Sequence, residues 1–165
     1  MIVKGDDILG RVERSIEIKA SPEKVWEMLA LDRLLEWQLG FEKEMKSVEY
    51  TSEVSTPKDK YRMGATAHGI PPKQGEPINC HFEITESLEN EKITHRLWEK
   101  VYRGTMAVLI TYILEPVDGG TKLTLVGVPE MPWGILGKII EPLILRMGIK
   151  DYERSLKNLK NILEK

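Results

Sequence analysis

A long helical pattern closes the chain and limits the folds that the sequence can adopt. It covers residues 132–164, and its second half has apolar side chains at the three- and four-residue spacing of a helix that lies on a surface. These side chains are Ile149, Tyr152, Leu156, Leu159 and Leu163. The spacing predicts that the second half packs on one face of a sheet.

The first half of the same helix has a wider apolar surface, which one sheet face does not cover. Its apolar side chains are Ile135, Leu136, Ile139, Ile140, Leu143, Ile144, Leu145 and Met147. We expect this surface to cover a cavity, to form a dimer contact, or to dock on a membrane or a partner protein. Pro142 removes a helix hydrogen bond, so it predicts a kink near residues 138–142 and a first half that moves as a gate.

The start of the chain predicts one strand followed by two short helices. Residues 11–19 alternate between apolar and polar side chains, which is the period of a half-buried strand. Ser21 and Pro22 suit the cap and the first position of a short helix. Asp32 suits the cap of a second short helix, which Gly40 ends.

The middle of the chain returns to the two-residue period of strands. The predicted strands are residues 45–54, 61–70, 78–85, 93–101, 105–115 and 123–128. The proline-rich residues 71–77 predict a loop, and residues 118–120, Asp-Gly-Gly, predict a tight turn. The element order indicates an α+β fold, in which a curved antiparallel sheet of six to seven strands grips the last helix. A hydrophobic cavity is expected between the sheet and that helix.

Length and charge restrict the classes of partner. A chain of 165 residues is expected to form one domain, residues 1–165, with residues 1–10 as an N-terminal extension. The net charge of −2 gives no reason to expect a nucleic acid as partner. The N-terminus lacks a hydrophobic signal core, and no uncharged run reaches the roughly 18 to 20 residues that span a bilayer. Peripheral contact with a membrane stays open, as does the choice between monomer and homodimer.

Cysteine and glycine usage argues against several kinds of site. The single cysteine, Cys80, excludes an intrachain disulfide, disfavours a multi-thiolate metal site and fits a reducing cytoplasm. The glycine pairs Gly64 with Gly69 and Gly119 with Gly120 do not form a phosphate-binding loop ahead of a helix. No cofactor is therefore expected.

Four segments resemble the START-like or SRPBCC superfamily, which includes polyketide cyclase/dehydrase-like and lipid-transfer domains. They are RSIEIKASPEKVW (residues 14–26), FEITESL (82–88), YILEPVDGGTKLT (112–124) and LKNLK (156–160). The likeness runs from about residue 11 to residue 164 and implies a helix-grip fold with a hydrophobic cavity. It carries no catalytic signature, because the superfamily includes both carriers and enzymes.

The three histidines are the candidates for a base or a metal ligand, but they show no metal-binding spacing. His81 is expected to point outward, opposite Phe82, and His68 lies near the proline-rich loop. His95 shares a strand face with Glu99, yet the two lie roughly 13 Å apart along a strand, too far for a direct hydrogen bond. His95 is therefore the one candidate for a catalytic base, and no metal site is predicted.

These patterns predict a cavity that binds a hydrophobic or amphipathic small molecule, such as a lipid, isoprenoid, quinone or polyketide-like compound. The hydroxyls of Tyr50 and Tyr112 and the ring of His95 are expected to orient its polar end. The full predicted lining is Trp37, Tyr50, Phe82, His95, Tyr112, Ile140, Leu143 and Met147. The expected role is transport or sensing; the alternatives are a cyclase or dehydratase that uses the same cavity, and a non-catalytic interaction module.

Overall fold

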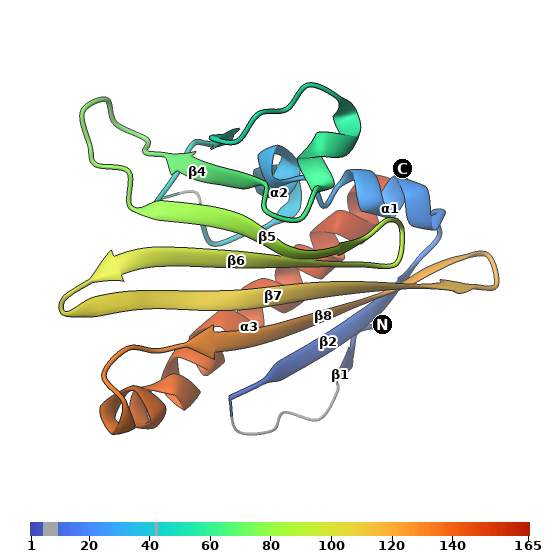
Figure 1. Ribbon diagram of the computed structural model, residues 1–165. Coiled ribbons are helices and arrows are strands. Elements are labelled where there is room, and N and C mark those ends of the chain that lie inside the picture. The colour runs from blue at the N-terminus through green and yellow to red at the C-terminus, as the bar shows by residue number, and fades with distance from the viewer. Residues whose placement is uncertain (5–9, 42) are drawn as a thin grey trace.

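The computed structural model describes residues 1–4, 10–41 and 43–165, and within them eight strands form one antiparallel sheet (Figure 1). The strands are β1 (Val3–Lys4), β2 (Val12–Ile18), β3 (Ser47–Tyr50), β4 (Thr66–Ile70), β5 (Cys80–Leu88), β6 (Lys92–Val101), β7 (Gly104–Val117) and β8 (Gly120–Glu130). Their order in the sheet is β1-β2-β8-β7-β6-β5-β4-β3. The α+β helix-grip fold is confirmed, with β1 as a two-residue strand added at one edge.

Strand alternation places one row of apolar side chains on the face of the sheet that α3 (Ile135–Leu163) covers. Neighbouring strands align these side chains in register: His95 lies between Ile84 and Ile110, and Tyr112 lies beside Ile93. His95 and Glu99 share this face, as the strand period predicts. This register determines which side chains of neighbouring strands lie side by side beneath α3.

The short helices after β2 differ in detail from the prediction. The helix α1 (Pro22–Glu27) forms as expected, with Pro22 at its start. The second segment begins as a 3₁₀ helix, η1 (Leu31–Arg33), and continues as α2 (Leu34–Trp37). Asp32 lies inside η1 and does not cap it, because its carboxylate pairs with the ammonium of Lys60.

The predicted strands at residues 45–54 and 61–70 are shorter than expected. A 3₁₀ helix, η2 (Pro57–Tyr61), interrupts this part of the chain. Thr56 and Asp59 form a capping box at its start, in which the Asp59 carboxylate accepts from the Thr56 backbone N–H at 2.7 Å. Pro57 occupies the start of η2, where its missing N–H leaves no helix hydrogen bond unmade.

The two-residue turn between β7 and β8 is confirmed at residues 118 and 119. Gly119 has a φ of +78°, a conformation that side chains disfavour. A Cβ on Gly120 would lie 2.1 Å from the carbonyl oxygen of Ile18. Both glycines are required where β8 starts beside the end of β2.

The helix α3 continues through Pro142 and has two different halves. Figure 1 shows it crossing behind the sheet, with its C-terminal end beside α1. In that half Leu156 and Leu159 are fully buried, and Asn158 Nδ2 donates to the Trp37 carbonyl oxygen at 3.0 Å. In the first half Ile135 is 80% exposed and Leu143 is 62% exposed. Among the described residues, no helix combines the length and apolar content needed to cross a bilayer.

Candidate functional site

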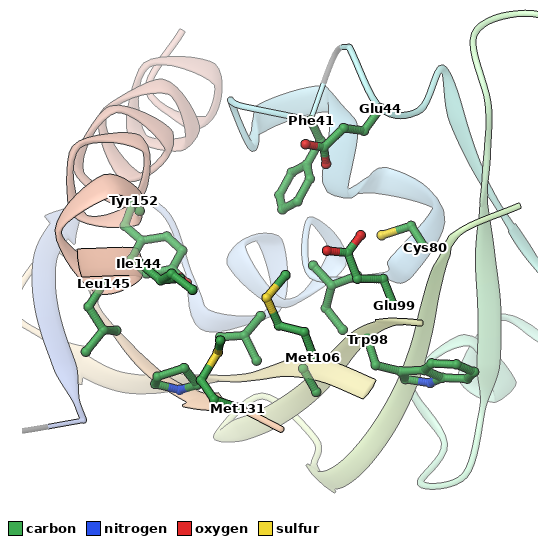
Figure 2. A pocket seen from close by; sticks show the side chains of 15 residues that line it. Phe41, Glu44, Cys80, Trp98, Glu99, Met106, Met131, Ile144, Leu145 and Tyr152 are labelled. Atoms are coloured by element: carbon green, nitrogen blue, oxygen red, sulfur yellow. The ribbon is translucent and has the colours of Figure 1, made fainter. Parts of the chain in front are cut away.

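A cavity of about 240 Å³ lies between the middle of α3 and the ends of β6, β7 and β8 (Figure 2). A second cavity of about 360 Å³ adjoins it beside α2. The residues that line both are Phe41, Glu44, Ile144, Gly148 and Tyr152. The space therefore runs along the underside of the middle of α3, upstream of the core residues Leu156 and Leu159.

The floor of the first cavity consists of two rows of the sheet's inner face. In the outermost row Glu99 lies between Cys80 and Met106, and in the next row Leu97 is paired with Val108. The alternation that buries His95 in the core also turns these residues toward α3, since they are two and four positions farther along β6. Apolar and sulfur-containing side chains thus form most of the floor.

The roof of the cavity is formed by α3 around Gly148. A Cβ on Gly148 would lie 3.8 Å from the Tyr152 ring, which is ordinary van der Waals contact, so a methyl group would fit here. Ile144 and Leu145 cover the space one turn upstream, and Met131 closes the end beside β8. On this part of α3 the exposed Leu143 is followed directly by the cavity-lining Ile144 and Leu145.

Two carboxylates face the cavity, and both influence the thiol of Cys80. Figure 2 shows Glu44 and Glu99 turned toward the same space, with the sulfur of Cys80 beside them. Partial burial, followed by the negative charge of Glu99, raises the pKa of Glu44 above its usual value. Burial, followed by both carboxylates, raises the pKa of Cys80 to about 12. The thiol is therefore protonated at neutral pH and is a poor nucleophile.

Tyr152 contributes a hydroxyl to both cavities. Burial raises its pKa to about 12, so the hydroxyl stays protonated and can both donate and accept. Within the described part of the chain it makes no hydrogen bond. An unused hydroxyl at a cavity wall is available to a bound molecule.

The predicted residues Trp37, His95 and Tyr112 come together, but in the packed core. The ring centroids of His95 and Tyr112 are 5.2 Å apart, and those of Trp37 and Tyr112 are 5.8 Å apart. None of the three lines the first cavity, and Trp37 alone lines the second. They form an aromatic cluster beneath α2 and α3.

His95 is 2% exposed, and neither ring nitrogen has a hydrogen-bond partner among the described residues. Burial lowers its pKa to about 3, and the opposing effect of the Leu29 backbone is smaller. The ring is therefore neutral at physiological pH. The Tyr112 hydroxyl accepts from Gln38 Nε2, and burial raises its pKa above the usual range.

The other predicted residues lie apart from this cluster. The hydroxyl of Tyr50 accepts from the Leu31 N–H at 3.0 Å and donates to the Lys60 carbonyl oxygen at 2.9 Å, so it holds η1 against η2. Phe82 is buried in the core. Ile140 and Leu143 are 38% and 62% exposed on the outer side of α3, and the side chain of Met147 lies outside the described residues.

Sequence reasoning missed the cavity residues Glu44 and Tyr152 as a site. Tyr152 was part of the helical stripe and Glu99 was on the correct strand face, yet nothing in the sequence shows that Phe41 and Glu44 approach them. A charged residue on an apolar strand face, as at Glu99, is the one signal that points there. Within the described residues no three His, Cys, Asp or Glu side chains are placed to hold a metal ion together.

Comparisons with known proteins agree with this architecture. The chain is similar to solved structures of a protein from Rhodobacter sphaeroides (TM-score 0.66, 17% identity, 99% of each chain covered) and of a protein from Mesorhizobium loti (TM-score 0.66, 15% identity, 93% of this chain and 96% of that chain). It is also similar to the Aha1 dimer from Colwellia psychrerythraea (TM-score 0.60, 17% identity, 93% of this chain and 96% of that chain). These identities establish a shared fold only. No protein of curated function matches the chain.

A family model described as polyketide cyclase / dehydrase and lipid transport matches residues 10–164. The match runs from two residues before β2 to the residue after α3, so it includes both walls of the cavity. The chain belongs to the polyketide cyclase / dehydrase and lipid transport family.

Proposed function

We propose that this protein binds a hydrophobic or amphipathic small molecule in the cavity beneath α3 and acts as its carrier or sensor. The observation that carries the proposal is the cavity itself, whose walls are mainly apolar, as at Leu97, Val108 and Ile144. With the adjoining space it approaches the size of sites for small organic molecules, roughly 300 to 1,000 Å³. Burial of apolar ligand surface supplies affinity at about 25 cal/mol per Å².

Entry of the molecule is assigned to the first half of α3. Ile144 and Leu145 face the cavity, while Ile135, Ile139 and Leu143 on the same half are exposed. Little packing therefore holds this half in place, and a small displacement opens the space. A carrier or sensor has better support than a cyclase or dehydratase, because His95, the expected base, lines neither cavity.

The proposal is tested by mass spectrometry of gently purified protein, followed by thermal unfolding with a panel of apolar compounds. We expect a co-purified apolar molecule, or a rise in the unfolding temperature with some members of the panel. A protein that contains no such molecule and is stabilised by none of the compounds contradicts the proposal.

A matched pair of variants locates the binding site. Val108→Phe places a larger side chain on the cavity floor, whereas Val128→Phe makes the same change on the opposite face of the neighbouring strand β8. We expect Val108→Phe to abolish ligand stabilisation and Val128→Phe to retain it. Retention of the ligand effect in both folded variants places the ligand elsewhere.

A further inference from the structure

The unpaired carboxylates of the cavity are the starting point. Several other carboxylates of this chain have cationic partners, as in the pairs Lys92 with Glu86 and Arg14 with Glu153. Glu44 and Glu99 have none: in the part of the chain that the structure describes, neither forms an ion pair or a side-chain hydrogen bond. Both nevertheless face one cavity (Figure 2).

Two like charges at the wall of an apolar space raise the free energy of the empty site. The pKa of Glu44 is raised first by burial and then by the negative charge of Glu99. A positively charged group between them removes the repulsion and gains two charge-assisted hydrogen bonds. A neutral ligand leaves the repulsion in place, and an anionic ligand adds a third negative charge.

The remaining polar and aromatic groups of the cavity suit the same kind of ligand. Phe41 and Tyr152 offer ring faces, which attract cations through their π electrons. The Tyr152 hydroxyl belongs to a partly buried side chain and has no hydrogen-bond partner in the described residues, so its oxygen can accept a hydrogen bond from an ammonium group. Trp98 does not take part, because its ring stacks on His81 on the other face of the sheet, with centroids 4.2 Å apart.

An organic cation fits this space better than a metal ion. Among the described residues, no three His, Cys, Asp or Glu side chains lie close enough to share a metal ion. Glu44, Glu99 and Cys80 therefore do not form a metal site. Beyond the carboxylates the lining is apolar, as at Met106, which suits a hydrocarbon body.

We infer that the molecule bound in this cavity is a cationic amphiphile, with a protonated amine or similar group between Glu44 and Glu99 and an apolar body beneath α3. The inference rests on the proposed function, because it names the chemical class of the ligand for the same site.

The test compares three probes that share one chain length: dodecylamine, dodecanol and dodecanoic acid. Their affinities for the full-length protein are measured near neutral pH by displacement of a fluorescent apolar dye, below the concentrations at which the probes aggregate. We expect the amine to bind about tenfold or more tightly than the alcohol, which corresponds to one or two charge-assisted hydrogen bonds, and the acid to bind most weakly.

Variants then show which carboxylates are responsible. In Glu44→Gln/Glu99→Gln we expect the advantage of the amine over the alcohol to disappear while the affinity for the alcohol is retained. Glu91→Gln is the matched control: Glu91 is an exposed residue just before β6, at the opposite end of that strand from Glu99, and its substitution should leave the amine preference intact.

The possible failures are distinguishable. Equal binding of amine and alcohol by the native protein, or tightest binding of the acid, overturns this inference and leaves the proposed function in place. An amine preference that persists in the double variant also overturns it, because the preference then arises elsewhere on the surface. Absence of binding by all three probes counts against the proposed function itself.

Discussion

Arg14 on β2 and Glu153 on α3 form an ion pair in which Arg14 Nε donates to Glu153 Oε1 at 2.9 Å. The arginine side chain is 2% exposed, because it occupies an inward position of a strand. Arg14 Nη1 also donates to the carbonyl oxygen of Glu13 at 2.7 Å. The pair fixes α3 over the sheet just downstream of Tyr152, so it holds one side of the cavity in position.

Glu153→Gln is expected to lower the free energy of unfolding by about 1 to 3 kcal/mol, because the buried guanidinium loses its charge-assisted hydrogen bond to this carboxylate. Urea unfolding at neutral pH measures the change. Arg154→Gln is the control, since Arg154 forms an exposed pair with Asp151 at 3.2 Å and its loss should cost less than about 0.5 kcal/mol. Equal effects of the two substitutions would show that the buried pair does not anchor the helix.

His95→Leu is expected to reduce the fall in the free energy of unfolding that occurs as the pH is lowered. Burial lowers the pKa of His95 from 6.5 to about 3 in the folded state, so below pH 6.5 the unfolded chain binds a proton that the folded protein does not. The native protein should therefore lose on the order of 3 kcal/mol between pH 6.5 and about pH 4 that the variant keeps. Urea titrations across this range measure the difference.

At neutral pH the same variant should be as stable as the native protein or more stable, since leucine leaves no unpaired ring nitrogens in the core. An NMR titration of the native protein gives an independent check, because the His95 ring should remain neutral well below pH 6.5. Parallel stability curves for the two proteins would mean that His95 is protonated in the folded state.

Two glycines in α3 should respond in opposite directions to the same substitution. Gly148→Ala is expected to stabilise the protein by about 0.5 to 1 kcal/mol, because the new methyl group meets nothing closer than 3.8 Å and the helix gains rigidity. Gly137→Ala should destabilise it, because a Cβ there would lie 2.3 Å from the Pro132 carbonyl oxygen. Thermal unfolding measures both, and a loss of stability in Gly148→Ala would contradict the fit of a methyl group against the Tyr152 ring.

Much of the fold was predictable because it follows local rules. The two-residue period placed Ile93, His95 and Leu97 on one face, and the helical stripe identified Leu156 and Leu159 as the anchor. The four resembling segments then specified the topology. These patterns depend on residues that are close in sequence, so they can be recognised without knowledge of tertiary contacts.

The candidate site was less predictable because it depends on depth and on distant contacts. Strand alternation shows which face of the sheet His95 occupies. It does not show which positions along that face are packed and which line a cavity. In the structure the cavity lies at Leu97 and Glu99, and His95 is packed in the core. Arg14 broke the apolar pattern of its strand for a reason that lies 139 residues away, at Glu153. The approach of Glu44 to Glu99 likewise has no local signature.

The two halves of α3 should differ in amide hydrogen exchange. Several apolar side chains in residues 133–147 are exposed, and Pro142 lacks the N–H that would close a helix hydrogen bond to residue 138. We therefore expect weaker protection there than at residues 150–162, where Leu156 and Leu159 are buried. Dodecylamine, if it occupies the cavity, should raise protection in the first half and leave the end around Leu156 and Leu159 unchanged, because these two residues pack in the core and line neither cavity. Val108→Phe provides the control, since it fills the space and should remove the response to dodecylamine. Uniform protection along the helix in the free protein would contradict the gate and would require another route into the cavity.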